Sequence, residues 1–292
     1  WLAAAQNELG LIYRDLGRWP EALACLNAAA ECYRLESSQD ALGRVLNNIG
    51  EVLLLQGDNP QALAAFAQAL AAMRTRLYAV DVYLNIGLAH QAAGDLTAAR
   101  AACEQALALA LAIDRRDTLA QVHFRLGEAL RLLGEDARAL DHFVLAAEIV
   151  EAQRQPIRDE GLKISLLGSW QQIFEGLVLH CLALGRVAAA FNWAERARAR
   201  AFADAVARQA SADGQGPLDP AATAEQARVA LPPDTTVLCY LTTGVQEREQ
   251  PLLQALPGDS ALRRHLSAPA RTLLFLLTPT GLAVHPCSLD PN

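Results

Sequence analysis

The sequence is poor in lysine, in aromatic residues and in long apolar runs. Lys163 is the only lysine, and the other basic residues are arginines, which is typical of a GC-rich bacterial genome. Aromatic residues make up 5% of a chain that is 52% hydrophobic, so alanine and leucine supply most of the apolar content. This composition favours closely packed helices over a β-sandwich, which needs more β-branched and aromatic residues.

Neither the charge nor the hydropathy of the chain points to nucleic acid or to a membrane. A net charge of −7 leaves no basic surface for a phosphate backbone. The sequence has no uninterrupted apolar run of about 18 residues, no basic amphipathic stretch and no signal peptide. We therefore expect a cytoplasmic protein that by itself binds neither nucleic acid nor membrane. Because the chain starts at Trp1 rather than at methionine, we expect it to be an excerpt.

Motifs for metal binding and catalysis are also missing. The six cysteines have no CxxC spacing, so they predict neither a zinc site nor a disulfide framework, and we expect no metal and no cofactor. The sequence contains no phosphate-binding loop, no GxSxG and no HExxH. The stretch "HPC" (His285–Cys287) holds the two residue types of a cysteine peptidase, but such pairs normally join residues distant in sequence. We expect this chain not to be an enzyme.

What the sequence does contain is a pattern that occurs four times. It first appears as "NELGLIYRDLGRWPEALACLNAAA" from Asn7, and its leading glycines are spaced by 40, 37 and 40 residues. A second glycine follows each leading glycine after seven residues, and an alanine stands five residues further on. A larger side chain follows this alanine after four residues, and a second alanine stands three residues after the larger side chain. The leading glycines and the first alanines are Gly10, Ala22, Gly50, Ala62, Gly87, Ala99, Gly127 and Ala139.

Each occurrence predicts two helices, A and B, that cross at small residues. The leading glycine and the alanine allow the two helices to approach closely, so Gly50 is interpreted as a packing residue rather than a hinge. The second glycine is expected to end helix A in the left-handed conformation, and the acidic residue that often follows it favours the start of helix B. The long period is expected to lengthen helix B and the connection that follows it.

This pattern resembles the tetratricopeptide repeat, which it matches four times over residues 3–150. The resemblance implies a mainly α fold, an α-solenoid in which helical hairpins form a right-handed superhelix. Its concave face, lined by helix A, is expected to bind a peptide or a partner protein. We expect four repeats in residues 1–154, a degenerate or capping hairpin in 155–210 and a linker in 211–220.

The repeat register places polar side chains along the expected concave face. The resemblance implies that asparagines in this position hydrogen-bond the backbone of an extended ligand, and arginines could grip a carboxylate. For each single residue an ordinary solvated helix face is the simpler interpretation, and for the cluster the two interpretations are balanced. The candidate partner-binding residues are Asn7, Arg14, Arg44, Asn47, Asn48, Glu51, Asn85, Gln91, Gln121, Arg125, Glu128 and Arg131.

A second resemblance covers roughly residues 160–289. The helix "AFNWAERARARAFADAVA", the strand "LPPDTTVLCYLTT" and the hairpin "LLFLLTPTGLAVHPC" resemble the opening part of a CHAT domain, a caspase-like domain of clan CD. Residues 221–292 are expected to be the incomplete start of this α/β domain, because the family's catalytic histidine and cysteine lie on later strands. The resemblance implies an interaction arm that regulates a downstream caspase-like cysteine peptidase. The alternative is the sensor arm of a bacterial signalling or transcription regulator without peptidase activity.

Overall fold

The computed structural model describes most of the chain. The described ranges are 1–154, 160–197, 224–243, 255–256 and 271–287, with the backbone alone at 154, 160–170 and 230. The predicted linker at 211–220 and the second half of the predicted 188–210 helix lie outside these ranges. The chain divides into two compact units. The first joins residues 1–153 with 246–267, and the second joins 154–245 with 268–292.

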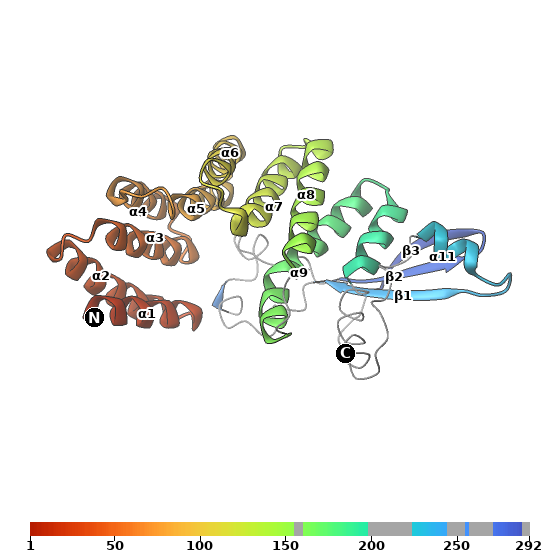
Figure 1. Cartoon of the computed structure of the whole chain (residues 1–292), viewed down its shortest axis with the longest axis horizontal. Coiled ribbons are helices and arrows are strands. Elements are labelled where there is room, and N and C mark those ends of the chain that lie inside the picture. Colours follow the sequence, from red (N-terminus) through yellow and green to blue (C-terminus); the bar gives the residue numbers. More distant parts are fainter. Residues whose placement is uncertain (155–159, 198–223, 244–254, 257–270, 288–292) are drawn as a thin grey trace. The chain divides into compact units, whose positions relative to one another are not determined.

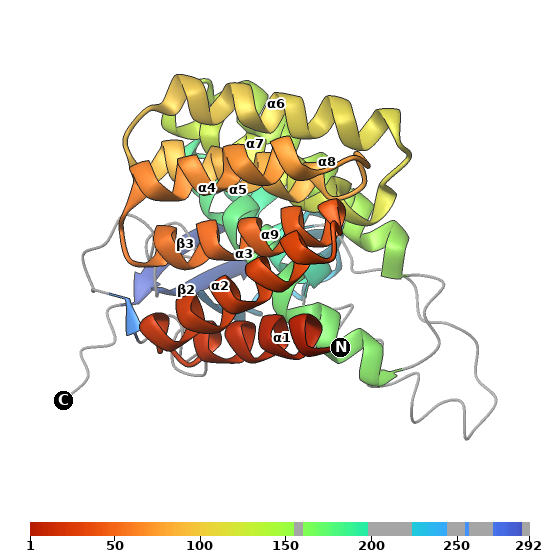
Figure 2. The same ribbon diagram turned by 90° about the vertical axis from the view of Figure 1, so that its left-hand side faces the viewer.

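The first unit is a series of antiparallel helix pairs, which confirms the prediction of a mainly helical solenoid (Figures 1 and 2). Odd-numbered helices are the A helices, and even-numbered helices are the B helices. Successive A helices contact one another, α1 with α3, α3 with α5, and α5 with α7, so they form one continuous face. The helices are α1 (Leu2–Asp15), α2 (Trp19–Leu35), α3 (Gln39–Leu55), α4 (Asn59–Ala72), α5 (Ala79–Ala92), α6 (Leu96–Ala112), α7 (Arg116–Leu132) and α8 (Asp136–Arg154).

The turn between the helices of each pair follows the predicted chemistry. The second glycine of each repeat has a positive φ, between 70° at Gly17 and 85° at Gly94, where a side chain would be strained. Two of the acidic residues after these glycines act as N-caps. Asp58 accepts a hydrogen bond from the N–H of Gln61 at 3.1 Å, and Asp95 does the same from Ala98 at 3.0 Å.

The leading glycines lie where helix A meets helix B. A Cβ atom on Gly50 would lie 2.4 Å from Cε1 of Phe66, whose side chain is fully buried. At the other leading glycines the carbonyl oxygen of the repeat's alanine lies only 3.3 Å from where the Cβ atom would be. The facing side chains there belong to the larger residue of helix B. These residues are Leu26 for Gly10, Cys103 for Gly87 and Phe143 for Gly127.

The extra length of the repeats is distributed differently from the prediction. Helix B is longer, as expected, with 17 residues in both α2 and α6. The connections that follow these two helices are short, however, and the remaining length goes into the next A helices, since α3 and α7 also have 17 residues. The shorter period, from Gly50 to Gly87, instead includes α4 and α5 with 14 residues each, joined by the longer connection 73–78.

The second unit contains helices and a three-stranded antiparallel sheet in the order β1-β2-β3. The predicted strand and hairpin are both present, and β2 is the central strand. Leu273, Phe275 and Leu277 alternate along β2 and are buried, and the Phe191 ring lies edge-on to that of Phe275 at 5.7 Å. Residues 187–197 are helical. The other elements are α9 (Glu160–Ala183), α11 (Ala224–Ala230), β1 (Val237–Thr243), β2 (Arg271–Thr278) and β3 (Gly281–Cys287).

Candidate binding groove on the A helices

The first three A helices share a groove of about 360 Å³. Five of the residues predicted to bind a partner line it, so the structure brings the N-terminal part of the predicted face together. The apolar part of its wall comes from α1, α5 and the 73–78 connection. The lining residues are Asn7, Glu8, Leu11, Arg44, Asn47, Asn48, Glu51, Met73, Tyr78, Asp81 and Val82.

Asparagine side chains join neighbouring A helices by the same hydrogen bond at two successive junctions. Asn48 Nδ2 donates to Asn7 Oδ1 at 2.9 Å, and Asn85 Nδ2 donates to Asn47 Oδ1 at 3.0 Å. In each pair the donor stands two residues, and the acceptor three residues, before the leading glycine of its repeat. Within the described residues the Oδ1 atoms of Asn48 and Asn85 accept no hydrogen bond, so each amide keeps an acceptor for a ligand.

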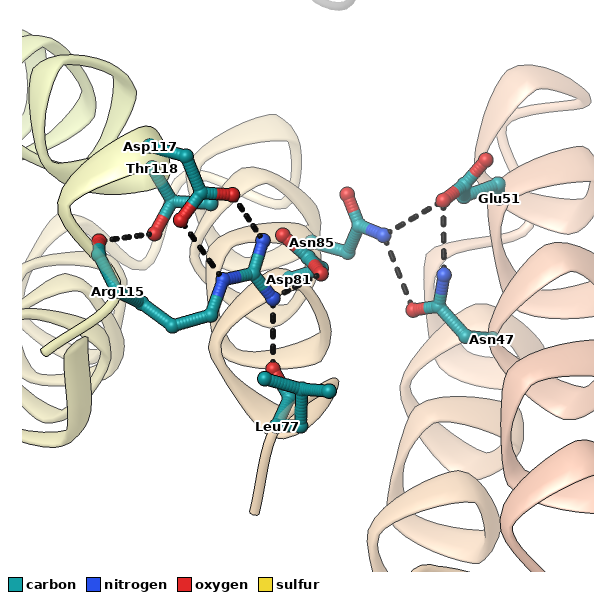
Figure 3. Close-up of polar contacts among 8 residues, drawn as sticks. All are labelled: Asn47, Glu51, Leu77, Asp81, Asn85, Arg115, Asp117 and Thr118. Atoms are coloured by element: carbon teal, nitrogen blue, oxygen red, sulfur yellow. Dashed lines mark hydrogen bonds and ion pairs between the residues drawn. The ribbon is translucent and has the colours of Figure 1, made fainter. Parts of the chain in front are cut away.

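Glu51 connects three A helices. Its carboxylate accepts hydrogen bonds from Arg14 Nη1 at 2.6 Å, from Asn47 Nδ2 at 2.8 Å and from Asn85 Nδ2 at 2.8 Å. Figure 3 shows the Asn85 amide reaching from α5 to both Glu51 and Asn47 on α3. Asn47 is 8% exposed, so its amide depends on these partners rather than on water. The network holds the groove residues in fixed positions before any ligand arrives.

The groove lining also carries an aromatic ring and two further charges, those of Arg44 and Asp81. The guanidinium of Arg44 lies over the Tyr78 ring, 5.2 Å from its centroid, and the Arg44 side chain is exposed. Arg115, at the start of α7, donates from Nη1 to the carbonyl of Leu77 at 2.7 Å and reaches the Asp81 carboxylate at 3.4 Å (Figure 3). Burial raises the pKa of Asp81, and the nearby Arg115 opposes that change.

The remaining predicted residues lie outside the groove lining, and their role stays a prediction. In the fourth repeat Glu128 pairs with Arg131 on the same helix at 3.0 Å, while Gln121 is exposed. Arg125 lies over the Phe124 ring at 5.8 Å, and burial lowers its pKa. Gln91, on α5, is half-buried.

Some lining residues were missed by the sequence analysis although the register contains a signal for them. Asp81 stands six residues before Gly87, as Arg44 stands six residues before Gly50. Glu8 likewise occupies the position that Asn48 and Asn85 hold in their repeats. Both acidic residues are found when the same register position is compared in every repeat. Met73 and Tyr78 belong to the connection that interrupts the repeat, and the repeat register contains no position for them.

His123 and His142, which no motif of the sequence connects, form a pair. His123 on α7 and His142 on α8 have their Nδ1 atoms 2.8 Å apart, and their rings stack with centroids 5.1 Å apart. Burial, together with the neighbouring His142, lowers the pKa of His123 to about 4. Burial also lowers the pKa of His142. Both rings are therefore neutral near pH 7, and one donates to the other across the helix pair.

The described residues offer few other places for chemistry. They contain no group of three or more histidine, cysteine, aspartate or glutamate side chains arranged to hold a metal ion. Likewise, none of the helices in the described ranges combines the length and the apolar character that a membrane span requires. His285 and Cys287 both lie on β3, and no hydrogen bond joins them in this part of the chain.

Comparisons with known proteins agree with the repeat architecture. The family model described as Tetratricopeptide repeat matches residues 1–75 and 78–152. Two crystal structures of tetratricopeptide-like repeats from a Podosopora anserina protein assigned as a kinesin light chain, one of them a variant with a single substitution, share the fold at 17% identity and a TM-score of 0.52. The alignments cover 73% of this chain and 96% and 97% of those chains. The MamA crystal structure aligns at 15% identity and a TM-score of 0.43, over 75% of this chain and 98% of MamA. No curated protein matches the chain.

Proposed function

This chain belongs to the tetratricopeptide repeat family, whose repeats suggest a protein–protein interaction scaffold, and we propose that its groove binds an extended segment of a partner protein. The observation that carries the proposal is the arrangement of the asparagines on α1 and α3. They line the groove, they are held in place by their own hydrogen bonds, and Asn48 keeps a carbonyl oxygen without a partner in the described part of the chain.

The groove lining is better suited to bind the main chain of a peptide than one particular peptide side chain. An extended peptide presents N–H and C=O groups along its length, and side-chain amides can both donate to and accept from them. Leu11, Val82 and the Tyr78 ring supply apolar wall for the peptide's side chains. The exposed guanidinium of Arg44 is available for a carboxylate of the ligand. Because the amides are already ordered, less conformational entropy is lost on binding.

The test is the affinity of peptides for variants of the groove. Peptides selected from a random pool on the whole chain should bind an Arg44→Ala/Asn48→Ala variant at least tenfold more weakly, which corresponds to about 1.4 kcal/mol. Fluorescence anisotropy with labelled peptides measures the change. Asn27→Ala is the matched control, because Asn27 is an exposed polar residue of the B helix α2 and lies outside the groove. Equal affinity of the double variant and the wild type would contradict the proposal.

We further propose that this arm regulates a caspase-like cysteine peptidase in a bacterial, cytoplasmic parent protein, and that residues 221–292 are the start of the peptidase domain. The support is the strand followed by a hairpin, as in the resemblance to the CHAT domain. Leu238 and Tyr240 on β1 are 51% and 56% exposed, which leaves apolar side chains for a further layer of such a domain. The proposal places the catalytic histidine and cysteine after Asn292.

A comparison of two lengths of protein tests this second proposal. The parent protein, including the residues after Asn292, should hydrolyse fluorogenic peptide substrates, and the 292-residue chain should not. Replacement of the downstream cysteine by alanine should abolish the activity. If the downstream sequence contains no separated histidine and cysteine, the arm belongs to a regulator without peptidase activity.

A further inference from the structure

The first unit contains a second cavity, of about 590 Å³, whose origin lies in the length of α4. This helix has 14 residues, whereas the B helices α2 and α6 have 17. The three missing residues correspond to roughly 4.5 Å of helix. The non-helical connection 73–78 takes its place, and the cavity lies between this connection, the end of α4, the start of α5 and the last turns of α6.

The cavity has an apolar wall and a basic edge. It shares Met73 with the groove, but its other lining residues are different. Leu70, Leu109 and Tyr83 provide large apolar surfaces, and alanines from α5 and α6 complete the wall. The volume lies in the range of ligand sites, and the lining combines apolar side chains with the polar Thr75, Gln105 and the two arginines. The lining residues are Leu70, Met73, Arg74, Thr75, Arg76, Ala79, Tyr83, Gln105, Ala108, Leu109 and Ala112.

The two arginines at this edge differ from the other arginines of the repeats. Between residues 1 and 153 every other described arginine side chain is in an ion pair or lies over an aromatic ring. Within the described residues the side chains of Arg74 and Arg76 have neither. Their backbone is nevertheless held, because the Asp40 carboxylate accepts hydrogen bonds from the N–H groups of Arg74 and Thr75 at 2.8 and 3.0 Å.

We propose that this cavity binds an acidic segment of a partner protein, with an apolar side chain in the cavity and carboxylates on Arg74 and Arg76. The planar guanidinium groups match carboxylates in bidentate geometry. The cavity lining itself contains no acidic side chain, and the Asp40 carboxylate, which accepts the Arg74 N–H, interacts with the charge of Arg74. The apolar wall gives a place for the side chain beside the carboxylate. The net charge of −7 disfavours nucleic acid as the source of the anion. This site does not depend on the function proposed for the groove.

The experiment selects random seven-residue peptides on the whole chain and determines which residues they require. Peptides that depend on this cavity should carry aspartate or glutamate next to leucine, methionine or phenylalanine. Their affinity, measured by anisotropy, should fall at least tenfold in an Arg74→Glu/Arg76→Glu variant. It should not change in the groove variant Asn48→Ala. Arg116→Glu is the matched control, since it reverses the charge of an arginine that is also exposed but lies outside the cavity.

Four outcomes would overturn the proposal. The first is a selection in which acidic peptides are not enriched. The second is equal binding of acidic peptides to the wild type and to Arg74→Glu/Arg76→Glu, with unchanged circular dichroism of the variant. The third is binding of octanoate or inorganic phosphate as tight as that of the peptides, since the site would then be one for small anions. If only Asn48→Ala weakens the selected peptides, the groove binds them and this cavity does not.

Discussion

Replacing Gly50 by alanine should lower the free energy of unfolding by about 2 kcal/mol, although alanine is the better helix former. The added methyl group would lie 2.4 Å from a carbon of the Phe66 ring, and that ring is fully buried. Helix propensity alone predicts a gain of about 1 kcal/mol from the same substitution, so the two effects have opposite signs. Urea denaturation followed by circular dichroism measures the difference.

A double-mutant cycle shows whether the crowding occurs at this contact. Phe66→Ala removes all the ring atoms that lie within 3 Å of the added methyl group, so the cost of Gly50→Ala should fall in that background. The destabilisation of the double variant should therefore be smaller than the sum of the two single effects. If Gly50→Ala is neutral or stabilising in the wild-type background, the helices do not cross closely at Gly50.

Replacing Glu51 by alanine should lower the free energy of unfolding by about 2 kcal/mol. Its carboxylate is a half-buried acceptor for Arg14, Asn47 and Asn85, so the substitution breaks contacts among three A helices at once. The nearly buried amide of Asn47 would lose an acceptor that water cannot easily replace. Thermal and urea denaturation of the purified chain measure the loss.

Two further variants separate this network from a general effect of removing charge. Glu8→Ala removes an exposed carboxylate on α1 whose partner is the neighbouring Asn7, and it should change stability by less than about 0.5 kcal/mol. Glu51→Gln keeps a carbonyl acceptor but loses the charge that faces Arg14. Its loss of stability should therefore lie between those of Glu8→Ala and Glu51→Ala. A cost of Glu51→Ala as small as that of Glu8→Ala would show that the network does not hold the A helices together.

The repeat part of the fold could be predicted because its determinants are local and recur. Gly17, Gly57, Gly94 and Gly134 mark turns that require a positive φ, and this requirement is visible in one residue type at one spacing. The leading glycines likewise indicate close helix crossings, because glycine recurs there at a regular spacing. The five groove residues followed from the register, because equivalent positions on successive A helices face the same side.

The parts that could not be predicted depend on how side chains meet across helices. His123 and His142 are 19 residues apart, and no other repeat has a histidine at either of their positions. Only the crossing of α7 and α8 brings their rings together. The second cavity follows from the early end of α4. A period of 37 instead of 40 residues signals the change in length, but it does not show where the shortened helix ends.

Photo-crosslinking tests most directly whether the A helices bind the partner. A photo-reactive phenylalanine analogue would replace either Leu11, an apolar groove residue of the A helix α1, or Glu31, an exposed residue of the B helix α2. The peptides would be selected on the Arg74→Glu/Arg76→Glu chain, so that the second cavity does not contribute. We predict crosslinks from position 11 and none above background from position 31. Crosslinks from position 31 that equal or exceed those from position 11 would contradict the account.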